Sequence, residues 1–162
     1  MKEKIIKLVF KSACFDELED QDQELIKNAK KSSNDAYAPY SGFMVGASLL
    51  LDNGKVINAN NQENVAYPSG LCAERVGMFY AGAEYPNVII NTIAIVAFSK
   101  SFKIMDIVSP CGSCRQVMAE YEEKQHKNIK VILYSSDDNI MILDSVKDLL
   151  PLLFKMPLLK NH

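Results

Sequence analysis

The sequence predicts an α/β protein in which a three-layer α/β/α sandwich surrounds a mixed sheet of about five strands. Two apolar runs that are typical of strands, residues 92–98 and 130–134, flank a helical pattern that begins near Cys111. A strand, a helix and a second strand of this length form a parallel pair with a right-handed crossover. With 162 residues, 48% of them hydrophobic, the chain can bury one sizeable core, so we expect a single domain over residues 1–162.

The N-terminal part predicts a strand and a helix. Within residues 1–19, the apolar stretch 5–10 could form an added edge strand. From residue 20 or 22 to about 36, acidic residues precede basic ones, an order that suits the dipole of a helix. Leu25 and Ile26 would lie on the inner face of that helix.

The middle of the chain predicts a β-hairpin. Residues 44–51 are apolar, and a strong turn signal at residues 52–54 separates them from residues 56–57. Near the other end, residues 146–154 predict a last short helix that ends close to its proline. An unusual apolar tail follows at residues 156–159.

Three cysteines and one glutamate form the most informative pattern in the chain. They lie in two short stretches, Cys72-Ala73-Glu74-Arg75 and Pro110-Cys111-Gly112-Ser113-Cys114-Arg115. Three thiolates can hold a tetrahedral Zn²⁺ and leave its fourth position for water, which distinguishes a catalytic site from a closed structural one. A carboxylate two residues from a ligand is well placed to move protons for that water, whose pKa falls to about 7 on the metal. The pattern therefore predicts a zinc hydrolase.

Both cysteine stretches also predict the start of a helix. Apolar residues follow Cys72 and Cys111 at roughly helical spacing, and Gly112 suits a tight turn between two ligands. A helix N-terminus lowers the pKa of a thiol, which favours the thiolate that binds metal. Three thiolates leave one excess negative charge on Zn²⁺, which Arg75 and Arg115 could offset from behind the ligands.

Other interpretations of the same residues stay open on sequence grounds. The Cys-x-x-Cys could be a redox pair, and Cys14 could complete a structural zinc site with four cysteines. Glu74 could be a solvated residue of the first helical turn that only favours the helix dipole. The joint occurrence of Cys-x-Glu and Pro-Cys-x-x-Cys favours the catalytic interpretation over these three.

Taken together, the motifs between about Tyr37 and Phe154 resemble those of the small, single-domain cytidine deaminases. The matching stretches are Tyr40-Ser41-Gly42-Phe43-Met44-Val45-Gly46-Ala47, Asn61-Gln62-Glu63-Asn64, Cys72-Ala73-Glu74-Arg75, Pro110-Cys111-Gly112-Ser113-Cys114-Arg115-Gln116 and Leu149-Leu150-Pro151. The cysteine motifs match the general pattern of zinc deaminases, with Cys in place of the first His. The resemblance implies hydrolytic deamination of cytidine or deoxycytidine to the uridine product and ammonia, with one Zn²⁺ per subunit.

The resemblance also implies roles for individual residues. Cys72, Cys111 and Cys114 would bind zinc, and Glu74 would shuttle protons. The nucleoside would be bound by Asn61 and Glu63 at the ribose hydroxyls, by Phe43 and the backbone near Ala73 at the pyrimidine, and by Phe154 from a neighbouring subunit. Asn61 and Glu63, two residues apart, point to the same side of a locally extended chain. Without the resemblance, ordinary turn capping, solvation and core packing explain these binding residues as well.

Composition favours a small substrate that is nearly neutral. The formal net charge is −2 and no basic cluster is present, which argues against a nucleic-acid partner. The chain has neither an apolar run of about 18 residues nor a signal-like leader, so we expect no membrane span and a cytoplasmic protein.

The resemblance also implies a homotetramer, with a homodimer as the alternative, and a place in pyrimidine salvage. Rival functions are deamination of a related aminated nucleoside, such as a nucleoside antibiotic, and a non-catalytic zinc module.

Overall fold

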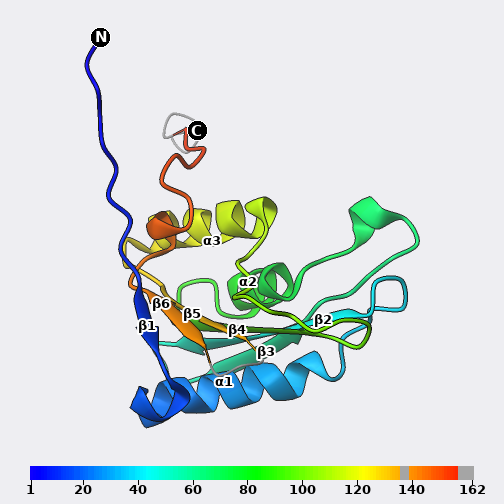
Figure 1. Cartoon of the computed structure of the whole chain (residues 1–162). Coiled ribbons are helices and arrows are strands. Elements are labelled where there is room, and N and C mark those ends of the chain that lie inside the picture. Colours follow the sequence, from blue (N-terminus) through cyan, green and yellow to red (C-terminus); the bar gives the residue numbers. More distant parts are fainter. Residues whose placement is uncertain (136–138, 157–162) are drawn as a thin grey trace.

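The computed structural model describes residues 1–135 and 139–156. In these residues, six strands and three helices build an α/β/α sandwich. The strands, in chain order, are β1 (Lys11–Ala13), β2 (Phe43–Leu51), β3 (Val56–Asn60), β4 (Ile90–Ser99), β5 (Lys130–Tyr134) and β6 (Ile140–Leu143). The helices are α1 (Asp20–Ser33), α2 (Ala73–Glu84) and α3 (Gly112–Gln125), with short 3₁₀ turns η1 (Phe15–Glu17), η2 (Tyr67–Ser69) and η3 (Val146–Asp148). Helix α1 covers one face of the sheet, and α2 and α3 cover the other (Figure 1).

The sheet is mixed, with the strand order β1-β6-β5-β4-β2-β3. Strands β4 and β5 run parallel, with Ile93 opposite Val131, while the other neighbouring pairs are antiparallel. The predicted strand–helix–strand unit around α3 and the predicted hairpin of β2 and β3 are therefore confirmed. Helix α3 follows the carboxyl end of β4, which is where open α/β sheets place their ligands.

The strand prediction was wrong at both ends of the chain. The sheet has six strands rather than about five, because β6 and the short edge strand β1 join it. The N-terminal edge strand is Lys11–Ala13, whereas residues 5–10 form no regular element. The register explains this difference: Lys11 lies opposite Ile142, and β6 ends one residue later at Leu143, so residues before 10 have no strand to pair with.

The last helix is shorter than predicted. Only Val146–Asp148 form a 3₁₀ turn, in place of a helix over residues 146–154. Leu150 precedes Pro151, and the ring of a proline disfavours the α conformation in the residue before it. Residues 157–159 of the apolar tail lie outside the described residues.

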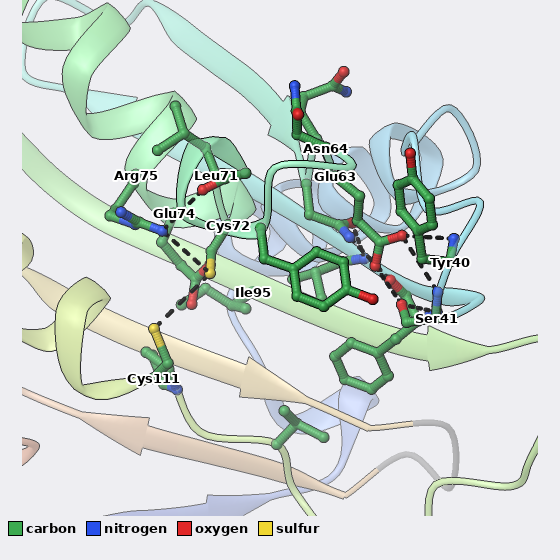
Figure 2. Close-up of a pocket in the computed structure, with 18 of the residues that line it drawn as sticks. Tyr40, Ser41, Glu63, Asn64, Leu71, Cys72, Glu74, Arg75, Ile95 and Cys111 are labelled. Carbon is green, nitrogen blue, oxygen red and sulfur yellow. Dashed lines mark hydrogen bonds between the residues drawn. The ribbon is translucent and has the colours of Figure 1, made fainter.

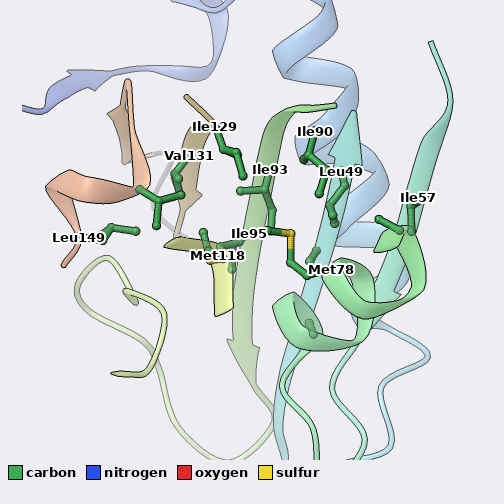
Figure 3. Packing of buried hydrophobic residues seen from close by; sticks show 14 of the residues in the cluster. Leu49, Ile57, Met78, Ile90, Ile93, Ile95, Met118, Ile129, Val131 and Leu149 are labelled. Atoms are coloured by element: carbon green, nitrogen blue, oxygen red, sulfur yellow. The ribbon is translucent and has the colours of Figure 1, made fainter. Parts of the chain in front are cut away.

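Alternation along the strands produces a core on each face of the sheet. On one face, Ile93 and Ile95 of β4 pack with Leu49 of β2, Met78 of α2 and Met118 of α3 (Figure 3). The alternate residues of β4, Ala94 and Val96, point to the opposite face of the sheet. There they pack under α1 with Leu25, Ile26, Leu50 and Ile132. The first cluster matters most for the site, because it holds α2 and α3 side by side. No helix in residues 1–135 and 139–156 is long and apolar enough to cross a membrane.

Candidate active site

The cysteine stretches begin α2 and α3, as predicted. Cys72 is the N-cap of α2, with φ −71° and ψ 153°, and Cys111 is the N-cap of α3, with φ −64° and ψ 164°. Cys114 lies in the first turn of α3. An added Cβ on Gly112 would meet nothing within 4 Å, and its φ is not positive, so the turn between the cysteines does not need a glycine.

The three thiols converge although they come from two helices. The Sγ atoms of Cys72 and Cys111 are 3.8 Å apart, those of Cys111 and Cys114 are 3.4 Å apart, and all three lie within 4.8 Å of one another. A tetrahedral Zn²⁺ with Zn–S bonds of about 2.3 Å separates its sulfur ligands by roughly 3.8 Å. The donor set and its spacing therefore fit zinc. Cys14, which is exposed, is not part of the cluster.

Hydrogen bonds lower the pKa of one of the thiols. The Cys114 thiol, together with the Arg75 guanidinium, lowers the pKa of Cys72 to about 5. The same hydrogen bond raises the pKa of Cys114. The lowered pKa of Cys72 favours its thiolate, which is the form of cysteine that binds metal.

Arg75 and Arg115 both lie near the cluster but hold different partners. Arg75 Nη2 is 3.9 Å from Cys72 Sγ and 3.4 Å from the Gly70 carbonyl oxygen, while its buried Nε has no partner. Arg115 donates from Nε to the Pro110 carbonyl at 2.7 Å and from Nη1 to the Leu149 carbonyl at 2.9 Å. Arg75 thus places positive charge against a thiolate, whereas Arg115 ties the segment before Cys111 to the chain after η3.

Among the lining residues in the described part of the chain, Glu74 is the carboxylate that lies beside the thiols. It is the second residue of α2, only 4% exposed, and its side chain lies at the same end of the cavity as Cys72 and Cys111 (Figure 2). Burial raises the pKa of Glu74, and the negative charge of Cys72 raises it further. A carboxyl group whose pKa is raised in this way holds a proton more readily than a solvated one, which suits a group that accepts and then donates a proton.

A cavity of about 710 Å³ extends from the thiols to a second polar end. Cys72, Glu74 and Arg75 lie at one end, while Glu63, Tyr40 and Ser41 lie at the other (Figure 2). Apolar side chains also line the cavity, among them Phe43, Val45 and Ile95. The cavity therefore suits a flat, partly apolar molecule with polar groups at both ends.

A short ladder in the loop before α2 couples the two ends. Gln62 and Leu71 exchange both backbone hydrogen bonds at 2.9 Å, and Gln62 also bridges to Tyr37. The chain at Gln62 is thus extended, so Asn61 and Glu63 point to the same side and both line the cavity. The same ladder positions this pair next to the start of α2.

Asn61 and Glu63 also shape the cavity wall. The side chain of Asn61 accepts from Val45 N–H at 2.7 Å and donates to the Phe43 carbonyl at 2.9 Å. Glu63 accepts from the backbone N–H of Tyr40 at 2.9 Å and from both the N–H and the hydroxyl of Ser41. The Ser41 hydroxyl is the main reason that the pKa of Glu63 is lowered, so this end of the cavity carries negative charge.

Ala73 and Phe154, like Cys114 and Arg115, are not among the residues that line the cavity. Ala73 is fully buried as the first residue of α2 and is not among the lining residues. Phe154 is 69% exposed, and its backbone exchanges hydrogen bonds with the Gln116 side chain at 2.8 and 3.2 Å. Their assigned contacts with the pyrimidine and with a neighbouring subunit's site stay predictions.

Sequence reasoning missed several lining residues. Val45 could have been found, because it lies two residues after Phe43 on the same face of β2. Ile95 required the pairing of β2 with β4, which no local pattern reveals. Tyr40 and Tyr67 meet edge to face at the polar end, with ring centroids 6.2 Å apart, although they come from separate loops.

The fold and the cluster define a zinc hydrolase of the α/β/α type, and comparisons narrow the class. Residues 19–129 match the family described as the cytidine and deoxycytidylate deaminase zinc-binding region. A cytidine deaminase of Halalkalibacterium halodurans is 47% identical over 98 residues, covering 60% of this chain and 70% of that protein. A probable cytidine deaminase of Dictyostelium discoideum is 30% identical over 132 residues, covering 82% of each.

Solved structures agree with the sequence comparisons. The crystal structure of cytidine deaminase from Burkholderia pseudomallei matches with a TM-score of 0.70 and 37% identity, covering 81% of this chain and 97% of that one. The enzyme from Mycobacterium tuberculosis matches with a TM-score of 0.63 and 30% identity, covering 82% and 96%. The chain belongs to the cytidine and deoxycytidylate deaminase family, whose members are hydrolytic enzymes that depend on zinc.

Removing the Asn61 side chain should destabilise the fold. Asn61→Ala leaves Val45 N–H and the Phe43 carbonyl unpaired beside a buried strand, so the free energy of unfolding should fall by about 1–3 kcal/mol. Urea denaturation measures this loss. Gln62→Ala is the matched control, since Gln62 is exposed and its change should stay within about 0.5 kcal/mol. Equal losses in both variants would contradict the structural role of Asn61.

Proposed function

We propose that this protein catalyses the hydrolytic deamination of cytidine and deoxycytidine, giving uridine or deoxyuridine and ammonia. The observation that carries the proposal is the placement of a buried carboxyl group, Glu74, beside three convergent thiols at one end of the cavity. The family of the chain and the names of its relatives point to the same reaction.

Cys72, Cys111 and Cys114 hold the metal, and Glu74 carries the protons. Bound zinc would supply Lewis acidity and would lower the pKa of water to about 7, well below that of bulk water. Glu74 accepts one proton from the water whose oxygen bonds to C4, and delivers that proton to N3 of the pyrimidine. The second proton of the same water passes through the Glu74 carboxyl group to the amino nitrogen, the C4–N bond breaks, and ammonia leaves while C4 keeps the oxygen as a carbonyl.

The rest of the nucleoside fills the cavity away from the metal. Glu63 and Asn61 bind the sugar hydroxyls, because a carboxylate accepts and an amide both accepts and donates hydrogen bonds. Phe43 packs against the pyrimidine, the backbone at Ala73 binds the edge of the base, and Arg75 offsets the excess charge of the thiolates. Arg115 acts less directly, by holding the segment that leads into Cys111.

The charges in the cavity favour a nucleoside over a nucleotide. Within the described part of the chain, Arg75 is the one Lys, Arg or His side chain among the lining residues, and it faces Cys72. The opposite end carries the ionised carboxylate of Glu63, which would repel a 5′-phosphate. The family includes deoxycytidylate deaminases by its description, so this distinction separates two real alternatives.

A related aminated nucleoside, such as a nucleoside antibiotic, is the second candidate substrate. The cavity volume of about 710 Å³ supports it. Pockets of about 300–1,000 Å³ accommodate drug-sized ligands, so a nucleoside with an added substituent would fit. A non-catalytic zinc module that uses Cys14 is disfavoured, because Cys14 lies outside the cluster of thiols.

Purified protein should release ammonia from cytidine and deoxycytidine but not from deoxycytidylate. The expected discrimination is at least tenfold in kcat/KM, because the one cationic lining residue among the described residues, Arg75, faces Cys72, and the charge of Glu63 disfavours a dianionic phosphate in the cavity. Ammonia release, the loss of cytosine absorbance and the zinc content are measured on one sample. Zinc-loaded protein that acts on an antibiotic nucleoside alone would select the second candidate. Zinc-loaded protein that acts on none of these substrates would refute the proposal.

Glu74→Gln should abolish turnover without removing the metal. The amide cannot accept the proton, so kcat should fall by at least about 10²-fold, the lower end of acid–base contributions. Zinc content and binding of the product uridine should persist. Glu84→Gln is the control, since Glu84 is exposed on the same helix, and it should keep normal activity. Near-normal turnover by Glu74→Gln would contradict the assignment.

We propose that the enzyme works in the cytoplasm, in pyrimidine salvage, and as a homotetramer. Large apolar side chains that a monomer leaves exposed support assembly: Phe79 and Tyr80 on α2, and Leu152 and Phe154 near the C-terminus. Phe154 then reaches the cavity of a neighbouring subunit. Light scattering should give four times the monomer mass; twice that mass would indicate the homodimer, and a monomer would contradict the assembly.

A further inference from the structure

The loop between β4 and α3 places a second aromatic ring against Phe43. Phe43 lines the cavity, and its ring is stacked on that of Phe102, with centroids 6.3 Å apart and planes 13° apart. Phe102 does not line the cavity, and its side chain is 55% exposed. Phe102 therefore stacks on a lining residue without being a lining residue itself.

Backbone contacts bring the loop to this position. The pairing of β2 with β4 ends at Phe43 opposite Ser99, and Lys100 N–H then donates to the Gly42 carbonyl at 3.2 Å. Gly42 has φ +64°, and a Cβ on it would lie 3.0 Å from Ser101 Oγ. A glycine at this turn thus lets the two segments approach closely, just before the second ring.

Stacking limits the freedom of a side chain that has few other constraints. Phe43 is the first residue of β2 and is only half-buried, so its ring would otherwise be free to change rotamer at the end of the strand. Stacked or edge-to-face aromatic pairs favour one arrangement by about two- to tenfold beyond the area they bury. Phe102 is absent from the cavity lining that contains Cys72 and Glu74, so its influence should fall on binding and not on proton transfer.

We propose that Phe102 is a positioning residue for the nucleobase, acting through Phe43. By stacking on Phe43, it holds the ring that packs against the pyrimidine and so lowers KM without changing kcat. This inference rests on the proposed deaminase function. It assigns a role in recognition to a loop residue that lies outside the cavity.

Steady-state kinetics with cytidine on the zinc-loaded full-length protein test the inference. Phe102→Ala should raise KM by about two- to tenfold with kcat unchanged, and Phe102→Tyr, which keeps the ring, should restore KM. Met105→Ala is the matched control, because Met105 is a large apolar residue of the same loop that is 70% exposed. In a Phe43→Ala background, the further change of Phe102 to Ala should have no effect on KM.

Each outcome separates the two proposals. Wild-type protein that binds zinc but deaminates no nucleoside refutes the proposed function and, with it, the role of Phe102. If the wild type is active, three results with Phe102→Ala would refute the inference and leave the proposed function intact. These are an unchanged KM, a lowered kcat in place of a raised KM, and an equal rise in KM with and without the Phe43→Ala change. Aromatic ¹H–¹³C spectra give a check independent of activity, because loss of the stacked ring should shift the Phe43 ring resonances, whereas Met105→Ala should not.

Discussion

The chemistry of this protein depends on holding the N-termini of two helices together. Cys72 and Cys111 are 39 residues apart in sequence, yet their sulfurs are 3.8 Å apart because α2 and α3 pack side by side over one face of the sheet. Movement of either helix by one turn, about 5.4 Å along its axis, would separate the sulfurs too far for one ion. The packing of Met78 and Met118 on β4 therefore determines the metal site as much as the cysteines do.

The cavity combines this cluster with a recognition surface built from loops. The Gln62–Leu71 ladder attaches the segment with Asn61 and Glu63 to the residue just before Cys72, so the polar end of the cavity and the end with the thiols share one backbone connection. Asn61 and Glu63 line the cavity and also form hydrogen bonds with the backbone of neighbouring segments. The side chains of this wall are therefore part of the local structure as well as of the cavity surface.

Local patterns predicted the interior elements well and the edges poorly. Strand β5 has the predicted bounds, and both cysteine stretches begin helices, because apolar periodicity and turn residues are local signals. The edge strand was misplaced, since its position depends on where β6 ends and not on its own composition. Within the site, the cysteines and Glu74 could be read from their spacing. Sequence spacing does not reveal that Arg75 and Arg115 have different hydrogen-bond partners. It also does not reveal that Phe102 stacks on Phe43.

The sequence by itself determined the donor atoms: three thiols and a carboxyl group at helix starts, in a chain able to bury one core. Those properties follow from residue types and short spacings, which the backbone converts into local structure. Only the tertiary structure decided which side chains meet across the cavity, which pKa values burial shifts, and that the rings of Phe43 and Phe102 stack. The reason is physical: such contacts join residues from separate strands and loops, and their distances are determined by the packing of the whole sheet.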